Sequence, residues 1–238
     1  MRAGWLALVI CWGVAAGAEA PAFEVASVKA SSAPGRAVRE FKPQTVTLQN
    51  ESLLSIVARA YGVGAFQVSG PDWLRNTNYD VFAKAPEAVP YDQMKLMLQT
   101  LLTQRFKLEF HREMRPLDVT VMTVGKNGAK LQPSESNGAP EMKSEADKGR
   151  IVYKSGNMTE LATIFGMTTI DMTGIKGRYD IVLDYAKYMD SAAERTMSIV
   201  FDAFREAAEV QLGLKFADKR TPVEVLVIDR VEKVPTEN

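Results

Sequence analysis

The chain of 238 residues contains a single cysteine, Cys11, which lies in an apolar stretch near the N-terminus. The rest of the chain therefore has no disulfide and no thiol chemistry. Its length is sufficient for an apolar core to hold the fold without cross-links. Cys11 itself is a poor site for a lipid anchor, because Ile10 precedes it where a small residue is expected.

The sequence also lacks an excess of charge of either sign, since 29 lysines and arginines balance 29 aspartates and glutamates. A surface that binds nucleic acid needs a basic field to hold the phosphates. We therefore expect no nucleic-acid partner.

Histidine is equally scarce, and the one present, His111, is flanked at strand spacing by Glu109 and Glu113. In a strand these side chains would share one face, where they could hold a metal ion or transfer protons. Alternating polar residues are also typical of the solvent face of a half-buried strand, and we favour that interpretation. Phosphate-binding loops, nucleophile elbows, zinc-protease motifs and dinucleotide fingerprints are missing, so we expect no metal and no cofactor.

The sequence also lacks an apolar run long enough to span a membrane. The apolar run at residues 5–14 is shorter than the roughly 20 residues that a membrane-spanning helix needs. Arg2 precedes this run and Ala18-Glu19-Ala20 follows it, with Ala16-Gly17-Ala18 as a competing cleavage site. This arrangement is typical of a secretory signal peptide. We predict cleavage near Ala20 and a periplasmic or secreted mature chain without a membrane span.

The chain does contain a short pattern that occurs twice, in which a glycine turn precedes Tyr-Asp and a β-prone run. The two copies read Gly70-Pro71-Asp72-Trp73 with Tyr79-Asp80-Val81, and Thr173-Gly174-Ile175-Lys176-Gly177-Arg178 with Tyr179-Asp180-Ile181. The flanking blocks match in the same order, and residues 105–110 and 115–119 are followed at one constant spacing by 211–216 and 221–225. We interpret this order as an internal repeat.

Periodicity predicts the same elements around both copies. Asn50 and Asn157 are each expected to cap a helix, the second in a capping box with Glu160. Gly62 and Gly64 should end the first of these helices, and Pro90 should open the next one. Period-two patterns predict separate strands at residues 106–110 and 117–124, and again at 212–216 and 223–228.

Each copy thus reads roughly β-α-β-β-α-β-β, which predicts an α+β fold with helices packed on mostly antiparallel sheets. We expect a first unit at residues 21–124 and a second at 151–238. Residues 125–150, rich in Gly, Pro, Ser and charged side chains, are expected to form a flexible linker.

With these blocks in place, the mature chain resembles the uncharacterised exported "soil-associated protein" family, a domain of unknown function abundant in soil bacteria. The resemblance is carried by Phe23-Glu24-Val25-Ala26-Ser27-Val28-Lys29, Ala60-Tyr61-Gly62-Val63, Gly70-Pro71-Asp72-Trp73-Leu74, Tyr79-Asp80, Leu101-Leu102, Arg105-Phe106-Lys107-Leu108, His111, Glu113, Asp171, Thr173-Gly174, Gly177-Arg178-Tyr179-Asp180, Leu212-Gly213-Leu214, Val227-Ile228-Asp229 and Pro235-Thr236-Glu237-Asn238. These blocks span nearly all of the mature chain.

The resemblance implies an extracytoplasmic sensing or interaction module, because similar domains also occur attached to membrane metallopeptidases of the antibiotic-sensor type. It brings no activity and no catalytic residues. One departure is that residues 161–170 are several positions shorter than the family pattern, which predicts a clipped first helix in the second unit.

The aspartates of the repeat allow two interpretations. Asp80 and Asp180 are equivalent, and paired carboxylates could act as acid and base. Each also begins a strand, where its oxygen can accept from turn N–H groups, and we favour this structural role. Asp171-Met172-Thr173-Gly174 is only faintly similar to an aspartic-protease loop, since Met172 is inserted, and we reject that match.

The single tryptophan of the mature chain, Trp73, follows the first turn. It could stack on a sugar or a partner, but closing one end of the core is the commoner use of its large apolar area.

The leading hypothesis is an exported, non-enzymatic module that binds a protein or another partner in the cell envelope. The contact surface is expected at the repeat turns, with Asp72, Trp73, Tyr79, Arg178 and Tyr179. Two alternatives stay open.

One alternative is an extracytoplasmic hydrolase that uses carboxylates such as Asp72, Asp80 and Asp180, which must then lie within about 10 Å in one cleft. The other is a small-ligand sensor domain, which predicts an apolar pocket with a few convergent polar groups.

Overall fold

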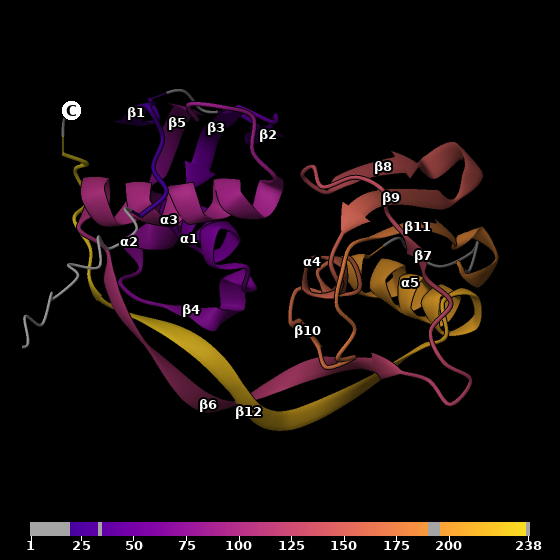
Figure 1. Cartoon of the computed structure of the whole chain (residues 1–238). Coiled ribbons are helices and arrows are strands. Elements are labelled where there is room, and N and C mark those ends of the chain that lie inside the picture. Colours follow the sequence, from indigo (N-terminus) through magenta and orange to yellow (C-terminus); the bar gives the residue numbers. More distant parts are fainter. Residues whose placement is uncertain (1–19, 33–34, 190–195, 237–238) are drawn as a thin grey trace, which may run out of the picture.

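The computed structural model of the chain describes residues 20–32, 35–189 and 196–236. Two lobes stand side by side and are joined along one edge by a long, curved two-stranded ribbon (Figure 1). Helices combine with three four-stranded, mostly antiparallel sheets, which confirms the α+β prediction. Residues 1–19, nearly all of the predicted signal peptide, lie outside the described residues.

Within the described ranges, no helix is both long enough and apolar enough to cross a membrane.

The first lobe is a sheet with strand order β1-β5-β3-β2, packed against helices α1 and α3. Its elements are β1 (Val25–Ala30), β2 (Val38–Phe41), β3 (Thr45–Ser52), α1 (Leu53–Tyr61), the 3-10 turn η1 (Ala65–Gln67), α2 (Trp73–Asn76), β5 (Asn78–Lys84) and α3 (Tyr91–Phe106). Gly62 ends α1 in the left-handed conformation and Pro90 precedes α3, as predicted.

The cap of α1 differs from the prediction. Ser52, not Asn50, accepts from the backbone N–H of Ser55 at the start of the helix. Asn50 lies earlier, in an irregular part of β3, with a positive φ of 52°. A β-bulge thus occupies the place where the sequence pattern favoured a cap.

The second lobe is a sheet with strand order β7-β11-β9-β8 and two helices. Its elements are β7 (Gln132–Pro133), β8 (Glu141–Glu145), η2 (Ala146–Lys148), β9 (Arg150–Gly156), α4 (Met158–Ala162), β11 (Tyr179–Asp184), η3 (Ala186–Tyr188) and α5 (Met197–Gln211). Asn157 and Glu160 form the predicted capping box of α4. This helix has 5 residues against 9 in α1, in line with the clipped helix expected there.

Residues 125–150 are not simply a flexible linker. They contribute β7 and β8, which pair with β11 and β9 at the two edges of the second sheet. The Gly- and Pro-rich composition that suggested a linker belongs to the turns between these short edge strands.

The ribbon consists of β6 (Glu109–Val124) and β12 (Leu214–Arg230), which run antiparallel along their whole length. We predicted two short strands in place of each, and this was wrong. Two further strands flank the ribbon: β10 (Thr169–Asp171) of the second lobe is parallel to β6, and β4 (Val68–Ser69) of the first lobe is parallel to β12. The lobes therefore share one sheet and are not independent units.

Two prolines lie directly opposite each other in the ribbon, Pro116 on β6 and Pro222 on β12. Further along β6, the N–H of Thr120 donates outward to Thr168, at an N–O distance of 3.2 Å. Amides alternate in direction along a strand, so Pro116, four positions earlier, would also point its N–H to the outer edge. The two prolines lack a backbone N–H, but at these positions that N–H would not have formed a hydrogen bond between β6 and β12.

From β3 to β6 and from β9 to β12 the element order is β-α-β-β-α-β, except that the short helix α2 lies between β4 and β5 in the first series. In both, the aspartate of the repeat accepts from a backbone amide: Asn50 donates to Asp80 at 2.8 Å and Ser155 to Asp180 at 2.9 Å. Duplication of one ancestral unit stays a prediction.

Each lobe has its own apolar core, and a third, smaller cluster lies on the ribbon. Its buried members are Val119, Val121 and Val223, with Phe66 of η1 packed from the first lobe and Ile170 of β10 from the second. The ribbon is therefore fixed to both lobes at the base of the space between them.

Candidate functional site: the cleft between the lobes

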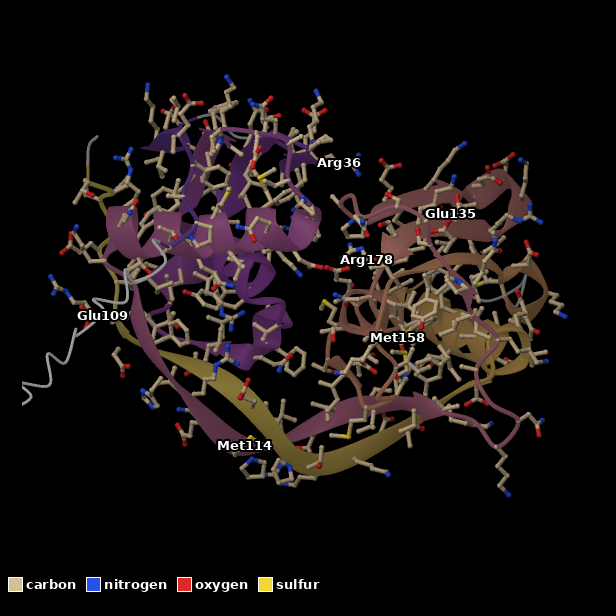
Figure 2. The ribbon with its side chains drawn as sticks, in the orientation of Figure 1. Arg36, Glu109, Met114, Glu135, Met158 and Arg178 are labelled. Atoms are coloured by element: carbon tan, nitrogen blue, oxygen red, sulfur yellow. The ribbon has the colours of Figure 1, made fainter. Side chains whose placement is uncertain are left out.

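Arg178, in the turn before β11, extends from the second lobe toward the first (Figure 2). Its side chain is only 11% exposed and forms ion pairs with Asp92 of α3 and Glu160 of α4, each at 3.4 Å. Its guanidinium carbon lies 5.4 Å from the ring centroid of Tyr91, and its Nε donates to the backbone oxygen of Ser155 at 2.9 Å. One arginine thus holds groups of both lobes.

Lys95 of α3 completes this polar bridge. Its ammonium contacts Asp92 at 2.7 Å and Glu160 of the other lobe at 3.5 Å. Burial raises the pKa of Asp92, but the hydrogen bond and charge of Lys95, with those of Arg178, outweigh it and lower the pKa below its usual value. The bridge therefore stays charged at neutral pH.

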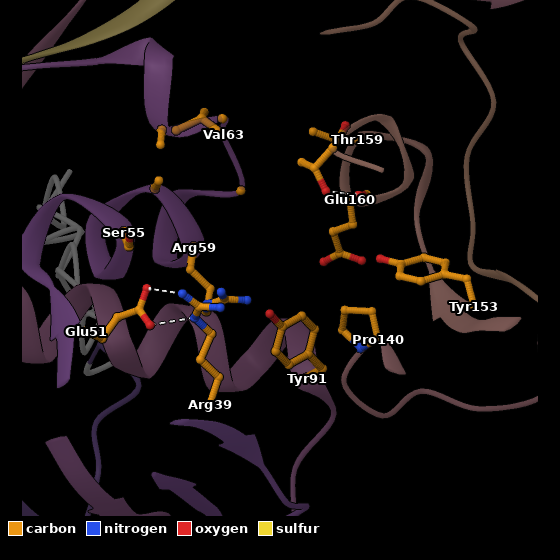
Figure 3. A pocket seen from close by; sticks show the side chains of 15 residues that line it. Arg39, Glu51, Ser55, Arg59, Val63, Tyr91, Pro140, Tyr153, Thr159 and Glu160 are labelled. Carbon is orange, nitrogen blue, oxygen red and sulfur yellow. Dashed lines mark hydrogen bonds and ion pairs between the residues drawn. The ribbon is translucent and has the colours of Figure 1, made fainter. Parts of the chain in front are cut away.

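A cleft of about 310 Å³ lies beside this bridge, between α1 and α4 (Figure 3). It is lined from the first lobe by Arg39, Glu51, Ser55, Ala58, Arg59, Gly62, Val63, Gly64, Ala65 and Tyr91, and from the second by Pro140, Tyr153, Thr159, Glu160 and Thr163. The volume is at the small end of the range for ligand pockets. The cleft adjoins a wider depression of about 1160 Å³, which shares Arg39, Arg59, Tyr91 and Tyr153.

The first lobe carries a buried carboxylate at this site. Glu51 of β3 is 1% exposed, and Arg39 of β2 donates to both of its oxygens, from Nε and from Nη2. A buried carboxylate is stable when it is paired and hydrogen-bonded in this way. Arg39 and Glu51 therefore neutralise each other.

Arg59 of α1 is different, because no ion pair among the described residues includes it. Its guanidinium lies 5.8 Å from the ring centroid of Phe41 and projects from α1 into the cleft (Figure 3). Its Nε is buried and has no hydrogen-bond partner among the atoms that the structure describes. Buried donors without partners are rare in folded proteins.

Two buried tyrosines face the same cleft, Tyr91 from the first lobe and Tyr153 from the second. Burial raises the pKa of both phenols, and for Tyr153 the charge of Glu160 adds to this effect. Arg59 opposes the shift at Tyr91 but does not cancel it. Both hydroxyls thus stay protonated at neutral pH and can donate hydrogen bonds.

Residues 54–231, from α1 to just beyond β12, match the family described as "Protein of unknown function (DUF3738)". The chain belongs to this family. No curated protein and no solved structure matches it. The DUF3738 match includes both helical faces of the cleft and the ribbon. The soil-associated label and the link to metallopeptidases stay predictions.

The predicted surface residues of this DUF3738 protein occupy different environments. Tyr79 is fully buried, with its hydroxyl donating to the backbone oxygen of Lys233 at 2.6 Å, so it is not part of an exposed surface. Trp73 is half-buried against the first core, and Asp72 before it is exposed. Tyr179 packs on the second core and donates to Lys176 at 2.8 Å. Of the five, only Arg178 takes part in the bridge between the lobes.

Two carboxylates of the hydrolase alternative, Asp80 and Asp180, lie in different lobes. Asp80 and Asp180 each accept a backbone amide within their own lobe, and those contacts give them the structural role favoured above. His111 contacts Asp229 at 2.8 Å on the exposed ribbon, while Glu113 pairs with Arg115. No group of three or more potential metal ligands occurs in the described part of the chain.

Proposed function

We propose that this protein is an exported, non-enzymatic binding module that holds a small ligand in the cleft between its lobes. The observation that carries the proposal is the convergence of polar side chains from both lobes on one concave site, where Arg59 has no ion-pair partner among the residues that the structure describes. The predicted signal peptide supports an extracytoplasmic location. A ligand in this position would contact both lobes, as is expected of the ligand of a sensor domain.

A small ligand fits this geometry better than a protein partner does. The cleft is concave, its volume is only about 310 Å³ and its tyrosines are buried, whereas protein partners need a broad accessible patch. Its two carboxylates, Glu51 and Glu160, are both engaged by arginines, so neither is free to act as a catalytic base. An envelope protein that reads the ligand-bound state remains part of the sensor hypothesis.

The test is a thermal-unfolding screen of the mature chain, residues 21–238, against small molecules extracted from bacterial envelopes. Thr159 is exposed and lines the cleft on α4, so T159W should fill the cleft without disturbing a core. T103W, on the exposed surface of α3, is the matched control. We expect at least one compound that stabilises the wild type and T103W but not T159W.

A screen in which every stabilising compound also stabilises T159W, or in which none stabilises the wild type, would overturn the cleft as the binding site.

A further inference from the structure

We infer that the cleft binds a small organic molecule through a single carboxylate, which Arg59 receives; this inference rests on the proposed function. The ligand class follows from the charges, the donors and the walls of the site, which are taken in turn.

The charges of the cleft and its bridge leave one cation unbalanced. Four cations are present, Arg39, Arg59, Lys95 and Arg178, and the three carboxylates are Glu51, Asp92 and Glu160. Every member except Arg59 has an ion-pair partner in this set. One unpaired guanidinium matches one negative charge on a ligand.

The guanidinium of Arg59 suits a carboxylate, because it can hold both carboxylate oxygens with two parallel N–H bonds. The Nε of Arg59 is enclosed by the protein, so a ligand would be held by the Nη groups of the guanidinium, which projects into the cleft (Figure 3). The phenols of Tyr91 and Tyr153 remain protonated and supply further donors at the same site.

The opposite wall excludes a more highly charged ligand. Glu160 faces Arg59 across the cleft (Figure 3), and its negative charge would repel a dianion such as a phosphate monoester. Its oxygens are occupied by Lys95, Arg178 and the backbone N–H of Asn157, so it does not recruit an ammonium group either.

The remaining wall is mainly apolar, and it predicts an apolar body behind the carboxylate. Ala58, Val63, Ala65 and Pro140 line it together with the tyrosine rings, and its other side chains are the hydroxyls of Ser55, Thr159 and Thr163. Such a surface favours aliphatic or aromatic groups over sugars.

The experiment is an NMR titration that follows the side-chain Nε–H signals of the arginines in the mature chain. The probes are phenylacetate, its neutral amide phenylacetamide, and phenyl phosphate. The Arg59 signal is assigned by its loss in R59K. We expect saturable shifts of this signal with phenylacetate, weaker ones with phenyl phosphate, and none with phenylacetamide.

The affinity of R59Q for phenylacetate, followed by the backbone amides of the cleft, should fall about tenfold or more, since a charge-assisted bond is lost. R112Q is the matched control, because Arg112 pairs with Glu224 on the exposed ribbon, outside the cleft. It should keep the wild-type affinity.

Equal binding of the amide, tighter binding of phenyl phosphate, or no saturable shift at Arg59 would each overturn the carboxylate assignment. The proposed function would survive these results if the thermal screen still found compounds that T159W excludes. It would fail separately if no compound passed that filter.

Discussion

The guanidinium of Arg178 in the second lobe lies over the ring of Tyr91 in the first, with 5.4 Å between its central carbon and the ring centroid. The same side chain pairs with Asp92 and Glu160, so it links α3 to α4. Because Tyr91 and Glu160 also line the cleft, this contact sets the relative position of the two walls. The lobes therefore form one site and not two adjoining surfaces.

Replacing Arg178 by alanine should lower the free energy of unfolding by about 2 kcal/mol, because the ion pairs and the bond to the Ser155 carbonyl are lost together. Chemical denaturation of the mature chain measures this change. The control is R220A, since Arg220 pairs with Asp118 where both side chains are largely exposed. It should cost less than about 0.5 kcal/mol. Equal costs for the two variants would show that Arg178 does not link the lobes.

The two tyrosines of the repeat offer a second comparison. Tyr79 is buried and ties the C-terminal segment to the first lobe through Lys233, so Y79F should cost about 1 kcal/mol of unfolding free energy. Tyr179 donates to Lys176 only three residues earlier, at an exposed site, and Y179F should cost less than half as much. Thermal unfolding of both variants decides the order. A larger cost for Y179F would mean that its turn, and not the C-terminal anchor, is the more important contact.

The environment of Asp180 predicts that the free energy of unfolding depends on pH. The backbone N–H of Ser155 and the hydroxyl of Ser134 lower its pKa in the folded state. A carboxylate with a lowered pKa stabilises the fold above its unfolded pKa of about 3.9, and this stabilisation is lost as the pH falls through the folded pKa. The unfolding free energy of the wild type should therefore decline on acidification below about pH 4.

Denaturation of D180N, which keeps an acceptor but has no charge, should show a shallower decline over this pH range. D147N alters an aspartate on the short turn η2 and should follow the wild type. If D180N and the wild type declined in parallel, the Ser155 contact would not stabilise the charged form.

Local patterns predicted where the long helices lie, although not the cap of α1, and they failed for the ribbon. The apolar stripe of α3, the glycine after α1 and the capping box of α4 are all set by residues a few positions apart. Each long strand was predicted as two, and the breaks fell at residues 111–116 and 217–222, which end in Pro116 and Pro222. Only pairing across some hundred residues shows that both prolines face the open edge, and this information is not local.

The cleft was missed for a related reason. Arg59 and Tyr153 lie in different lobes, and nothing in the spacing of either residue distinguishes it from an ordinary polar or core position. Arg178 was predicted as part of a surface, and the structure places it at the edge of the site instead. Long-range folding, and not a motif, brings these side chains together.

The most direct test of the account is hydrogen exchange, followed by mass spectrometry, on the mature chain with and without a compound that passes the T159W filter. A ligand in the cleft should slow exchange on both walls at once, at residues 58–65 around the end of α1 and at residues 158–163, which comprise α4 and its C-cap. The exposed middle of the ribbon around Met114 should be unaffected. Protection confined to one lobe, or found on the ribbon alone, would contradict a shared site between the lobes.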